Sequence, residues 1–412
     1  MDAQDQNQDN MIIEIDFKNR IIFISESIVS DDLVRIITSH KLEGFEITPL
    51  FIIDEEESED ESEDGDVGLL DTVNKRFEDI FKLYKEMKAL DWDESEFNFD
   101  QCLIDFDKAP KDVTEMMIKT IMWQWESDSV ASQCPAVIIA PYEPCTELWE
   151  AELRINDNES VHANTYSEIV RMGFPVPQDV LRTMLAHNEA HRRFEVIGKA
   201  LKQIKQNSIK LAYKKEFEGY VVTQEDVLED MILFYFVMFC FERVQFMDSF
   251  GTTFIIAQSG WYQAIGQAVK KICQDEYEVH AEYRKEVLNK LISTPKGKEV
   301  FERLKPKLVS ILEEVVDSEI RWTVEDLFEH DKKTLVGTNS KLMTQWCLFN
   351  AKAVANSFGL KTKYTFPKSN PMPILEDWIN MNKQQSAPQE ADNPAYKINA
   401  VEVDDEDVIF KI

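Results

Sequence analysis

An uninterrupted apolar segment in the middle of the chain constrains its fold more than any other feature. The residues from Met231 to Phe241 read MILFYFVMFCF. A helix of this length is too short to span a bilayer, and a helix that is apolar on every side has to be buried. We therefore predict a helix through the centre of a folded core. Glu242 follows directly, where a charge is costly unless it is paired or bound to a cation.

From about residue 70 onwards the whole chain has a helical pattern. Glycine (12) and proline (14) are scarce among its 412 residues, which favours long helices over a turn-rich β architecture. The apolar periodicity and the positions of the prolines predict helices over residues 110–133, 144–173, 178–204, 224–250, 261–292, 295–330 and 338–357. We predict an all-α helical bundle as the main domain, covering residues 69–380.

The two ends of the chain differ from this domain. Residues 1–53 contain two alternating apolar stretches around Lys18-Asn19, which predict a hairpin, followed by a short helix and a strand. We interpret them as a small N-terminal α/β appendage, whose role the sequence does not define. Residues 54–68 begin DEEESEDESEDGD and predict an acidic disordered linker. Residues 381–412 lack periodicity and predict a flexible acidic tail.

Charge and cysteine usage narrow the classes of partner and compartment. The chain has 77 acidic and 45 basic residues, and its net charge is -32. Such a charge repels phosphate backbones and anionic lipid, so we expect neither nucleic acid nor a membrane as a partner. The six cysteines form no CxxC pair, and the N-terminus MDAQDQNQDN is not a signal peptide. We expect a cytoplasmic protein.

Carboxylate and imidazole side chains recur on four predicted helices in an order that suggests a metal site. A four-helix bundle that binds two metals takes one carboxylate from each of two helices and a Glu-x-x-His from each of the others. The successive helices of this chain offer Asp128, then Glu159 with His162, then Glu242, then Glu276 with His280. Each acid alone is more simply a capping or solvated group. Together, in order, they predict a dimetal site suited to iron or manganese.

A tyrosine accompanies the second of these pairs. At 100° per residue, Glu159, His162 and Tyr166 point at roughly 0°, 300° and 340° around a helix axis, so all three share one face. We therefore expect the Tyr166 ring close to the metal site.

These motifs resemble the small, radical-generating subunit of class I ribonucleotide reductase, a family with a ferritin-like dimetal carboxylate fold, over about residues 72–412. Asp128 lies 31 residues before Glu159, and Glu242 lies 34 before Glu276, as in that family. The resemblance implies that Tyr166 is the radical site. Matches to other family positions imply electron-relay roles for Trp92, Asp275 and Tyr396, an acid at Glu390 before the tail tyrosine, and an apolar wall at Phe246 and Phe250.

The resemblance also implies a mechanism and partners. Two iron ions per chain, or manganese in their place, would be bridged by Glu159 and Glu242 and would use O2 to oxidise Tyr166. The large (α) subunit would bind the tail and use the radical to reduce ribonucleoside diphosphates to deoxyribonucleotides for DNA synthesis, a thiol reductant acting on that subunit. A homodimer of the small subunit is expected. The implied activity is that of ribonucleoside-diphosphate reductase subunit β.

Two positions depart from the family pattern. Gln274 stands where an arginine is common, and His280 is one residue late for Glu-x-x-His. In a regular helix, position i+4 is rotated about 100° from i+3. A π-bulge absorbs one extra residue and restores the direction. We predict such a bulge between Asp275 and His280, with Glu278 facing away from the site.

Two alternatives remain open on the sequence alone. One is a self-contained dimetal oxidase or hydroxylase of the same fold, which would need an apolar substrate channel. The other is a structural helical protein in which the buried acids form only salt bridges.

Overall fold

A computed structural model describes residues 13–16, 21–24, 46–49, 72, 75–133, 135–142, 145–186, 189–212 and 222–380. Long helices make up most of the described chain: α2 (Glu78–Ala89), α3 (Asp100–Lys108), α4 (Lys111–Ala131), α6 (Thr146–Gly173), α8 (Glu189–Ala212), α9 (Gln224–Cys240), α10 (Phe246–Gln258), α11 (Gln263–Gln274), α12 (Ala281–Ser293), α13 (Pro295–Arg321) and α14 (Ser340–Ser357). The shorter helical segments are η1 (Glu94–Glu96), α5 (Pro135–Ile139), η2 (Ala140–Tyr142), α7 (Pro177–Ala186), η6 (Pro373–Leu375) and α15 (Glu376–Ile379). Three π-helical turns, η3 (Phe241–Gln245), η4 (Asp275–His280) and η5 (Trp322–Leu327), extend α9, α11 and α13.

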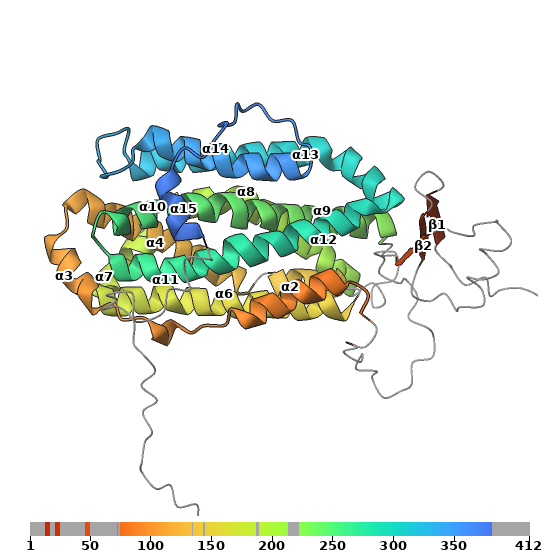
Figure 1. Ribbon diagram of the computed structural model, residues 1–412, viewed down its shortest axis with the longest axis horizontal. Helices are drawn as coiled ribbons and strands as arrows, with labels where there is room; N and C mark the ends of the chain where they lie inside the picture. The colour runs from red at the N-terminus through yellow and green to blue at the C-terminus, as the bar shows by residue number, and fades with distance from the viewer. Residues whose placement is uncertain are drawn as a thin grey trace, which may run out of the picture.

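The long helices run along the long axis of the molecule in stacked layers (Figure 1). α13 and α14 form the upper layer, α8, α9 and α10 lie beneath them, and α6 and α2 lie on the opposite side. α9 packs against α8, α12 and α13, while α4 packs against α6 and α10. The predicted all-α bundle is confirmed. None of the described helices is long and apolar enough to cross a membrane.

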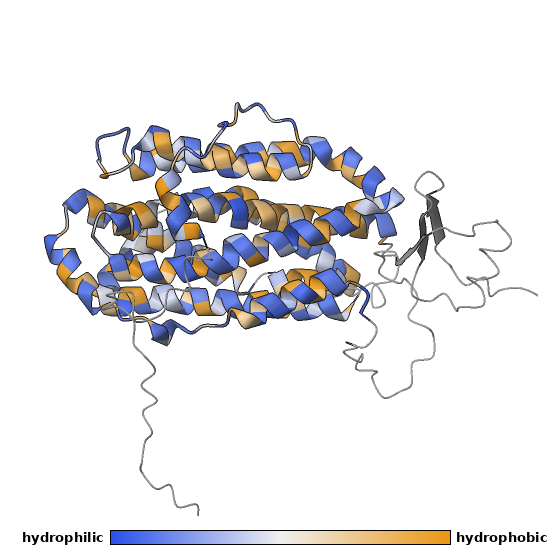
Figure 2. Ribbon diagram, in the orientation of Figure 1, coloured by the Kyte–Doolittle hydropathy of each residue, from blue (hydrophilic) through white to orange (hydrophobic). Residues whose placement is uncertain are grey.

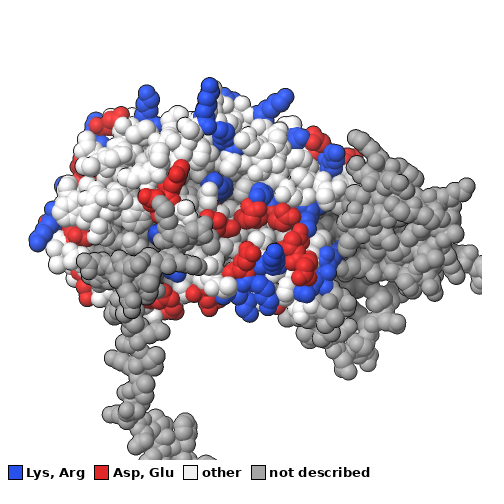
Figure 3. Space-filling view, viewed as in Figure 1, with Lys and Arg blue, Asp and Glu red and all other residues white. Residues whose placement is uncertain are grey.

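The predicted central helix is present and buried on all sides. Every residue from Met231 to Phe241 is at most 3% exposed. The outer helices are amphipathic, with polar residues alternating along their outward faces (Figure 2). Acidic and basic groups lie side by side on the surface (Figure 3). One such pair joins α12 to α2, because Lys290 Nζ lies 2.5 Å from Asp79 Oδ2.

Two predicted helices differ from the observed ones. The predicted helix 178–204 is covered by α7 up to Ala186 and by α8 from Glu189 to Ala212, and residues 187–188 lie outside the described chain. The predicted helix 224–250 continues through η3 into α10 and ends at Gln258. α10 and α11 then pack closely at Gly266, where a Cβ would lie 2.4 Å from Ala257 Cβ. A larger residue at Gly266 would push the two helices apart.

The last helix of the described domain, α15, is short and packs against α10. α15 places the Trp378 ring on Phe254 of α10, with ring centroids 5.1 Å apart and planes 10° apart. The Trp378 indole N–H donates to Gln258 Oε1 at 3.0 Å. Asn380, the last described residue, directly follows this anchored helix.

The N-terminal residues form a three-stranded sheet in the order β1-β2-β3. β1 (Ile13–Asp16) and β2 (Ile21–Ile24) are antiparallel, which confirms the predicted hairpin. β3 (Glu46–Pro49) pairs in parallel with β2. The helix expected before β3, and the linker expected over residues 54–68, lie outside the described residues.

Candidate metal centre

The structure brings the six predicted donors together in the interior of the bundle. α4 carries Asp128, α6 carries Glu159 and His162, η3 carries Glu242, and η4 carries Glu276 and His280. All six side chains are at most 1% exposed. Four segments that are distant in sequence therefore direct four carboxylates and two imidazoles to one place.

The donors fall into two groups that share two members. Asp128, Glu159, His162 and Glu276 have ligand atoms within 4.8 Å of one another, and so do Glu159, Glu242, Glu276 and His280. The shared carboxylates are Glu159 and Glu276. Glu242, which we expected to bridge together with Glu159, belongs to only one group. Glu276 Oε1 lies between the two imidazoles, 3.2 Å from His162 Nδ1 and 3.6 Å from His280 Nδ1.

The donor atoms face one another without forming hydrogen bonds. His162 Nδ1 lies 3.2 Å from Glu276 Oε1, 3.4 Å from Glu159 Oε2 and 4.0 Å from Asp128 Oδ2. Both oxygens of these three carboxylates, and His162 Nδ1, have no hydrogen-bond partner. Buried polar atoms are normally satisfied, so a converging set without partners needs an explanation. Oxygen and imidazole donors in this arrangement fit a pair of divalent transition-metal ions.

The predicted bulge before His280 is present. Residues Asp275–His280 form the π-helical turn η4 between two regular helices. His280 Nδ1 consequently lies 3.6 Å from Glu276 Oε1 and 3.6 Å from Glu159 Oε1. Glu278, at the outside of this turn, is exposed. Glu242 also lies in a π-helical turn, η3, which the sequence analysis did not anticipate.

Trp92 and Asp275 extend the site through hydrogen bonds. The Trp92 indole N–H donates to Asp275 Oδ2 at 2.7 Å, and the same oxygen lies 3.1 Å from His162 Nε2. The Trp92 and His162 rings are stacked with centroids 5.9 Å apart. Trp92 follows α2 in the chain, so the contact joins the outer α2 region to the centre of the bundle.

Tyr166 lies one helical turn after His162 on α6 and is fully buried. Its hydroxyl has no hydrogen-bond partner. Burial, together with the charges of Asp128 and Glu276, raises the pKa of Tyr166 well above its ordinary value. Phe246 and Phe250 are both fully buried and stack on each other with centroids 5.3 Å apart. Tyr396 and Glu390 lie outside the described residues.

An arginine that the sequence analysis did not single out contacts one donor. Arg284 Nε donates to Glu242 Oε1 at 3.1 Å, and Arg284 also donates to Glu152. All three side chains are fully buried. Spacing offered a signal, because Arg284 lies four residues after His280 and Glu152 lies seven before Glu159. Each therefore shares a helix face with a donor.

Burial and the neighbouring charges shift the pKa values of the donors in different directions. Burial, with the charge of Glu159, raises the pKa of Asp128 well above its ordinary value. Burial raises the pKa of Glu242 to about 8, although Arg284 opposes the shift. Burial also acts to raise the pKa of Glu159, but the two adjacent imidazoles lower it to about 2. Burial acts to lower the pKa of His280, and the carboxylates Glu276 and Glu159 raise it to about 10. The cluster therefore binds protons that a divalent cation would displace.

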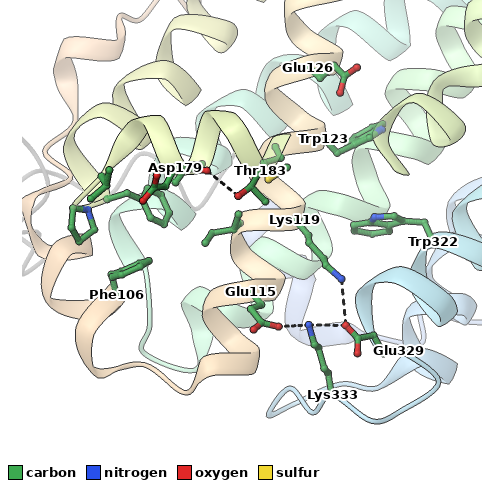
Figure 4. Close-up of a pocket in the computed structure, with 16 residues that line it drawn as sticks. Phe106, Glu115, Lys119, Trp123, Glu126, Asp179, Thr183, Trp322, Glu329 and Lys333 are labelled. Atoms are coloured by element: carbon green, nitrogen blue, oxygen red, sulfur yellow. Dashed lines mark hydrogen bonds and ion pairs between the residues drawn. The ribbon is translucent and has the colours of Figure 1, made fainter. Parts of the chain in front are cut away.

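A separate cavity of about 620 Å³ lies between α3, α4, α7 and η5 (Figure 4). Its apolar lining includes Trp123 and Trp322, and its charged rim is internally paired. Lys119 Nζ lies 3.5 Å, and Lys333 Nζ 2.9 Å, from Glu329 Oε1. None of the six donors lines this cavity.

Comparisons with known proteins agree with the sequence motifs. The sequence model of the family described as ribonucleotide reductase, small chain, matches residues 71–371. The β subunit of ribonucleoside-diphosphate reductase from Haemophilus influenzae is 22% identical over 337 residues, covering 80% of this chain and 88% of that protein. The β subunit of phage T4 is 21% identical over 341 residues, covering 77% and 86%.

Solved structures of similar proteins share the fold. The R2 subunit of ribonucleotide reductase from Clostridium botulinum has a TM-score of 0.61 at 17% identity, covering 73% of this chain and 88% of its own. The dimanganese(II)-NrdF of Streptococcus sanguinis has a TM-score of 0.61 at 14% identity, covering 76% and 99%. The predicted resemblance is confirmed, since the family model spans most of the helical domain that carries the six donors. This chain belongs to the ribonucleotide reductase small chain family.

Proposed function

We propose that this β subunit holds two metal ions on Asp128, Glu159, His162, Glu242, Glu276 and His280 and forms a radical on Tyr166. The observation that carries the proposal is the convergence of buried donors without hydrogen-bond partners, on the helix face that also carries a buried tyrosine. Glu159 and Glu276 would bridge the metals. The other four side chains would bind one metal each.

Iron suits these donors, and so does manganese, since both accept carboxylate and imidazole ligands. When bound, the metal pair supplies, with O2, the oxidising equivalent that removes an electron and a proton from Tyr166. The protein's own contribution is to orient the donors and to keep water out. The Tyr166 hydroxyl is fully buried and has no hydrogen-bond partner among the described residues, which would keep bulk water and reductants away from a radical on its oxygen.

The chain of contacts from His162 through Asp275 to Trp92 supports a relay that carries the oxidising equivalent out of the bundle. Asp275 accepts the Trp92 N–H and so fixes the indole against the metal-site histidine. Tyr396 on the tail would take over beyond Trp92. The large subunit would then use the radical to reduce ribonucleoside diphosphates to deoxyribonucleotides. A thiol reductant would return the large subunit to its reduced state.

The same proposal includes a homodimer and a cytosolic location. The described cysteines (Cys102, Cys145, Cys240, Cys273 and Cys347) are all free thiols, which fits a reducing compartment. An independent oxidase of the same fold is not favoured, because the curated relatives are β subunits of a two-component reductase.

Substitution of Tyr166 by Phe tests the proposal. Tyr166→Phe removes only the hydroxyl, so metal binding should stay at the wild-type stoichiometry while the tyrosyl signal and nucleotide reduction fall to background. Metal content and an electron paramagnetic resonance spectrum after anaerobic Fe(II) loading and exposure to O2 measure both. An unchanged radical signal in the variant would place the radical elsewhere.

A further inference from the structure

Arg284 is a fixed cation at one end of the candidate metal centre. It lies on α12, one turn after His280, and is fully buried. Its Nε donates to Glu242 Oε1 at 3.1 Å, and its other contact is the Glu152 carboxylate on α6. Aromatic rings surround it, including Phe234 and Tyr283 with centroids 5.6 Å and 5.3 Å from the guanidinium carbon.

The Arg284 contact leaves Glu242 with one available oxygen. Oε1 accepts from Arg284, whereas Oε2 has no hydrogen-bond partner. An arginine N–H–carboxylate bond in a water-excluded interior is strong and directional. A metal bound by Glu242 would therefore use Oε2 alone, and the carboxylate could not turn to present both oxygens without breaking the Arg284 contact.

The surroundings of the two donor groups differ in charge. Each group contains three carboxylates and one histidine. In the first group, the outer nitrogen of His162 is backed by the Asp275 carboxylate at 3.1 Å, which makes an imidazole a better ligand. In the second group, neither nitrogen of His280 has a hydrogen-bond partner, and the Arg284 cation contacts the Glu242 carboxylate at 3.1 Å. Among the described residues, no lysine or arginine pairs with Asp128, Glu159 or Glu276.

We propose that Arg284 is a positioning residue that holds Glu242 to single-oxygen, terminal coordination and makes the metal site of Glu242 and His280 the weaker of the two. This inference rests on the proposed two-metal function. Glu152 limits the effect, because its carboxylate neutralises the Arg284 cation next to it. Removing the Glu152 charge should therefore leave the Arg284 cation uncompensated. The metal bound by Glu242 and His280 should then bind more weakly, while the other metal is unaffected.

Titration of the full-length apoprotein with Mn(II) tests this, with free Mn(II) followed by its electron paramagnetic resonance signal. Wild type should bind two ions in two steps. Glu152→Gln should bind the first ion as wild type does and the second at least about tenfold more weakly, because one uncompensated charge a few ångströms away in a protein interior repels a cation by at least that much. The double variant Glu152→Gln/Arg284→Gln removes the cation and should return the second affinity to wild type or above it.

A second buried arginine provides the matched control. Arg193 is also buried, pairs with Glu319 and lies between two indole rings, but neither residue contacts any of the six donors. Arg193→Gln/Glu319→Gln should lower the melting temperature as the Arg284 pair does and leave both Mn(II) affinities unchanged. Arg284→Lys, which keeps the charge but not the Nε contact, should leave the second site weak while freeing Glu242 to turn.

The outcomes separate the two proposals. Equal weakening of both ions in Glu152→Gln, or no change in either, would overturn the role of Arg284 while leaving the two-metal site intact. Failure of the wild-type protein to bind two ions would instead overturn the proposed function. If Glu152→Gln does not fold, the comparison of Arg284→Lys with the double variant decides the question, because only the lysine variant keeps the cation.

Discussion

Trp92, Asp275 and His162 form a continuous line of contacts from the outer part of the bundle to the candidate metal centre. Trp92→Phe removes the indole N–H and leaves Asp275 without that donor. We expect a loss of about 0.5–1.5 kcal/mol in the free energy of unfolding, because Asp275 Oδ2 loses one hydrogen bond and keeps its contact with His162 Nε2. Metal content and the Tyr166 radical should persist, whereas nucleotide reduction with the large subunit should fall to background.

Spectroscopy and an activity assay on the same preparation check this expectation. Phe97, which packs edge-on against the Trp92 ring, offers a control position. Phe97→Leu should reduce stability without abolishing reduction. Wild-type turnover in Trp92→Phe would exclude the indole from the relay.

At this scale the sequence indicated most of the site. Charges inside apolar helices are conspicuous, and the helical period predicted that Glu159, His162 and Tyr166 share a face. The Arg284–Glu152 pair was missed because its partners are 132 residues apart and each residue alone is an ordinary charge on an amphipathic helix. The sequence also could not show which carboxylates belong to both donor groups, since that depends on the position of each helix along its own axis.

At the scale of elements, η4 lets Glu276 and His280 face the same point although they are four residues apart. Deleting Glu278 should remove the extra residue and leave a regular helix with a Glu-x-x-His spacing. Because a π-bulge amounts to one inserted residue, α11 and α12 should stay in register. We expect a folded protein with unchanged Mn(II) stoichiometry and a melting temperature within about 4 °C of wild type, a shift of roughly 1 kcal/mol.

Deletion of Lys285, in the regular helix that follows, is the matched control. The deletion rotates the part of α12 after residue 285 by about 100° relative to the part before it. The apolar residues after the deletion then no longer face the core, and the protein should not fold. Loss of metal binding in the Glu278 deletion, with the fold retained, would show that the π-helical turn itself is required.

The sequence predicted η4 but not η3, for a physical reason. η4 was predicted because Glu276 and His280 are four residues apart, whereas the family pattern Glu-x-x-His places its two donors three residues apart. Glu242 stands alone in its helix, so no second donor revealed that the turn around it is widened.

At the scale of the whole molecule, the proposed function makes this chain one of two partners, and its C-terminal tail is the segment that we expect to bind the large subunit. The tail of residues 381–412 alternates acids with apolar residues, namely Val401, Val403, Val408, Ile409, Phe410 and Ile412. Such a segment can order on a groove of a partner, with the apolar side chains giving most of the affinity. A peptide of residues 393–412 should inhibit the mixed enzyme competitively, and a scrambled peptide of the same composition should not.

Truncation after Asn393 removes Tyr396 as well as these apolar residues. The truncated chain should form its radical normally and support no nucleotide reduction at any ratio to the large subunit. Full activity of that chain would refute both the docking role of the tail and the role of Tyr396.

The anchoring of Trp378 on Phe254 and Gln258 turns the tail into a tether of fixed origin. Sixteen peptide units separate Asn380 from Tyr396. A chain extends at most about 3.3–3.6 Å per residue, so Tyr396 cannot travel farther than about 55 Å from Asn380. That radius limits where a docked large subunit can receive the oxidising equivalent. A longer segment between Asn380 and Tyr396 would let Tyr396 occupy a larger volume. The effective concentration of Tyr396 at its position on the large subunit would therefore fall.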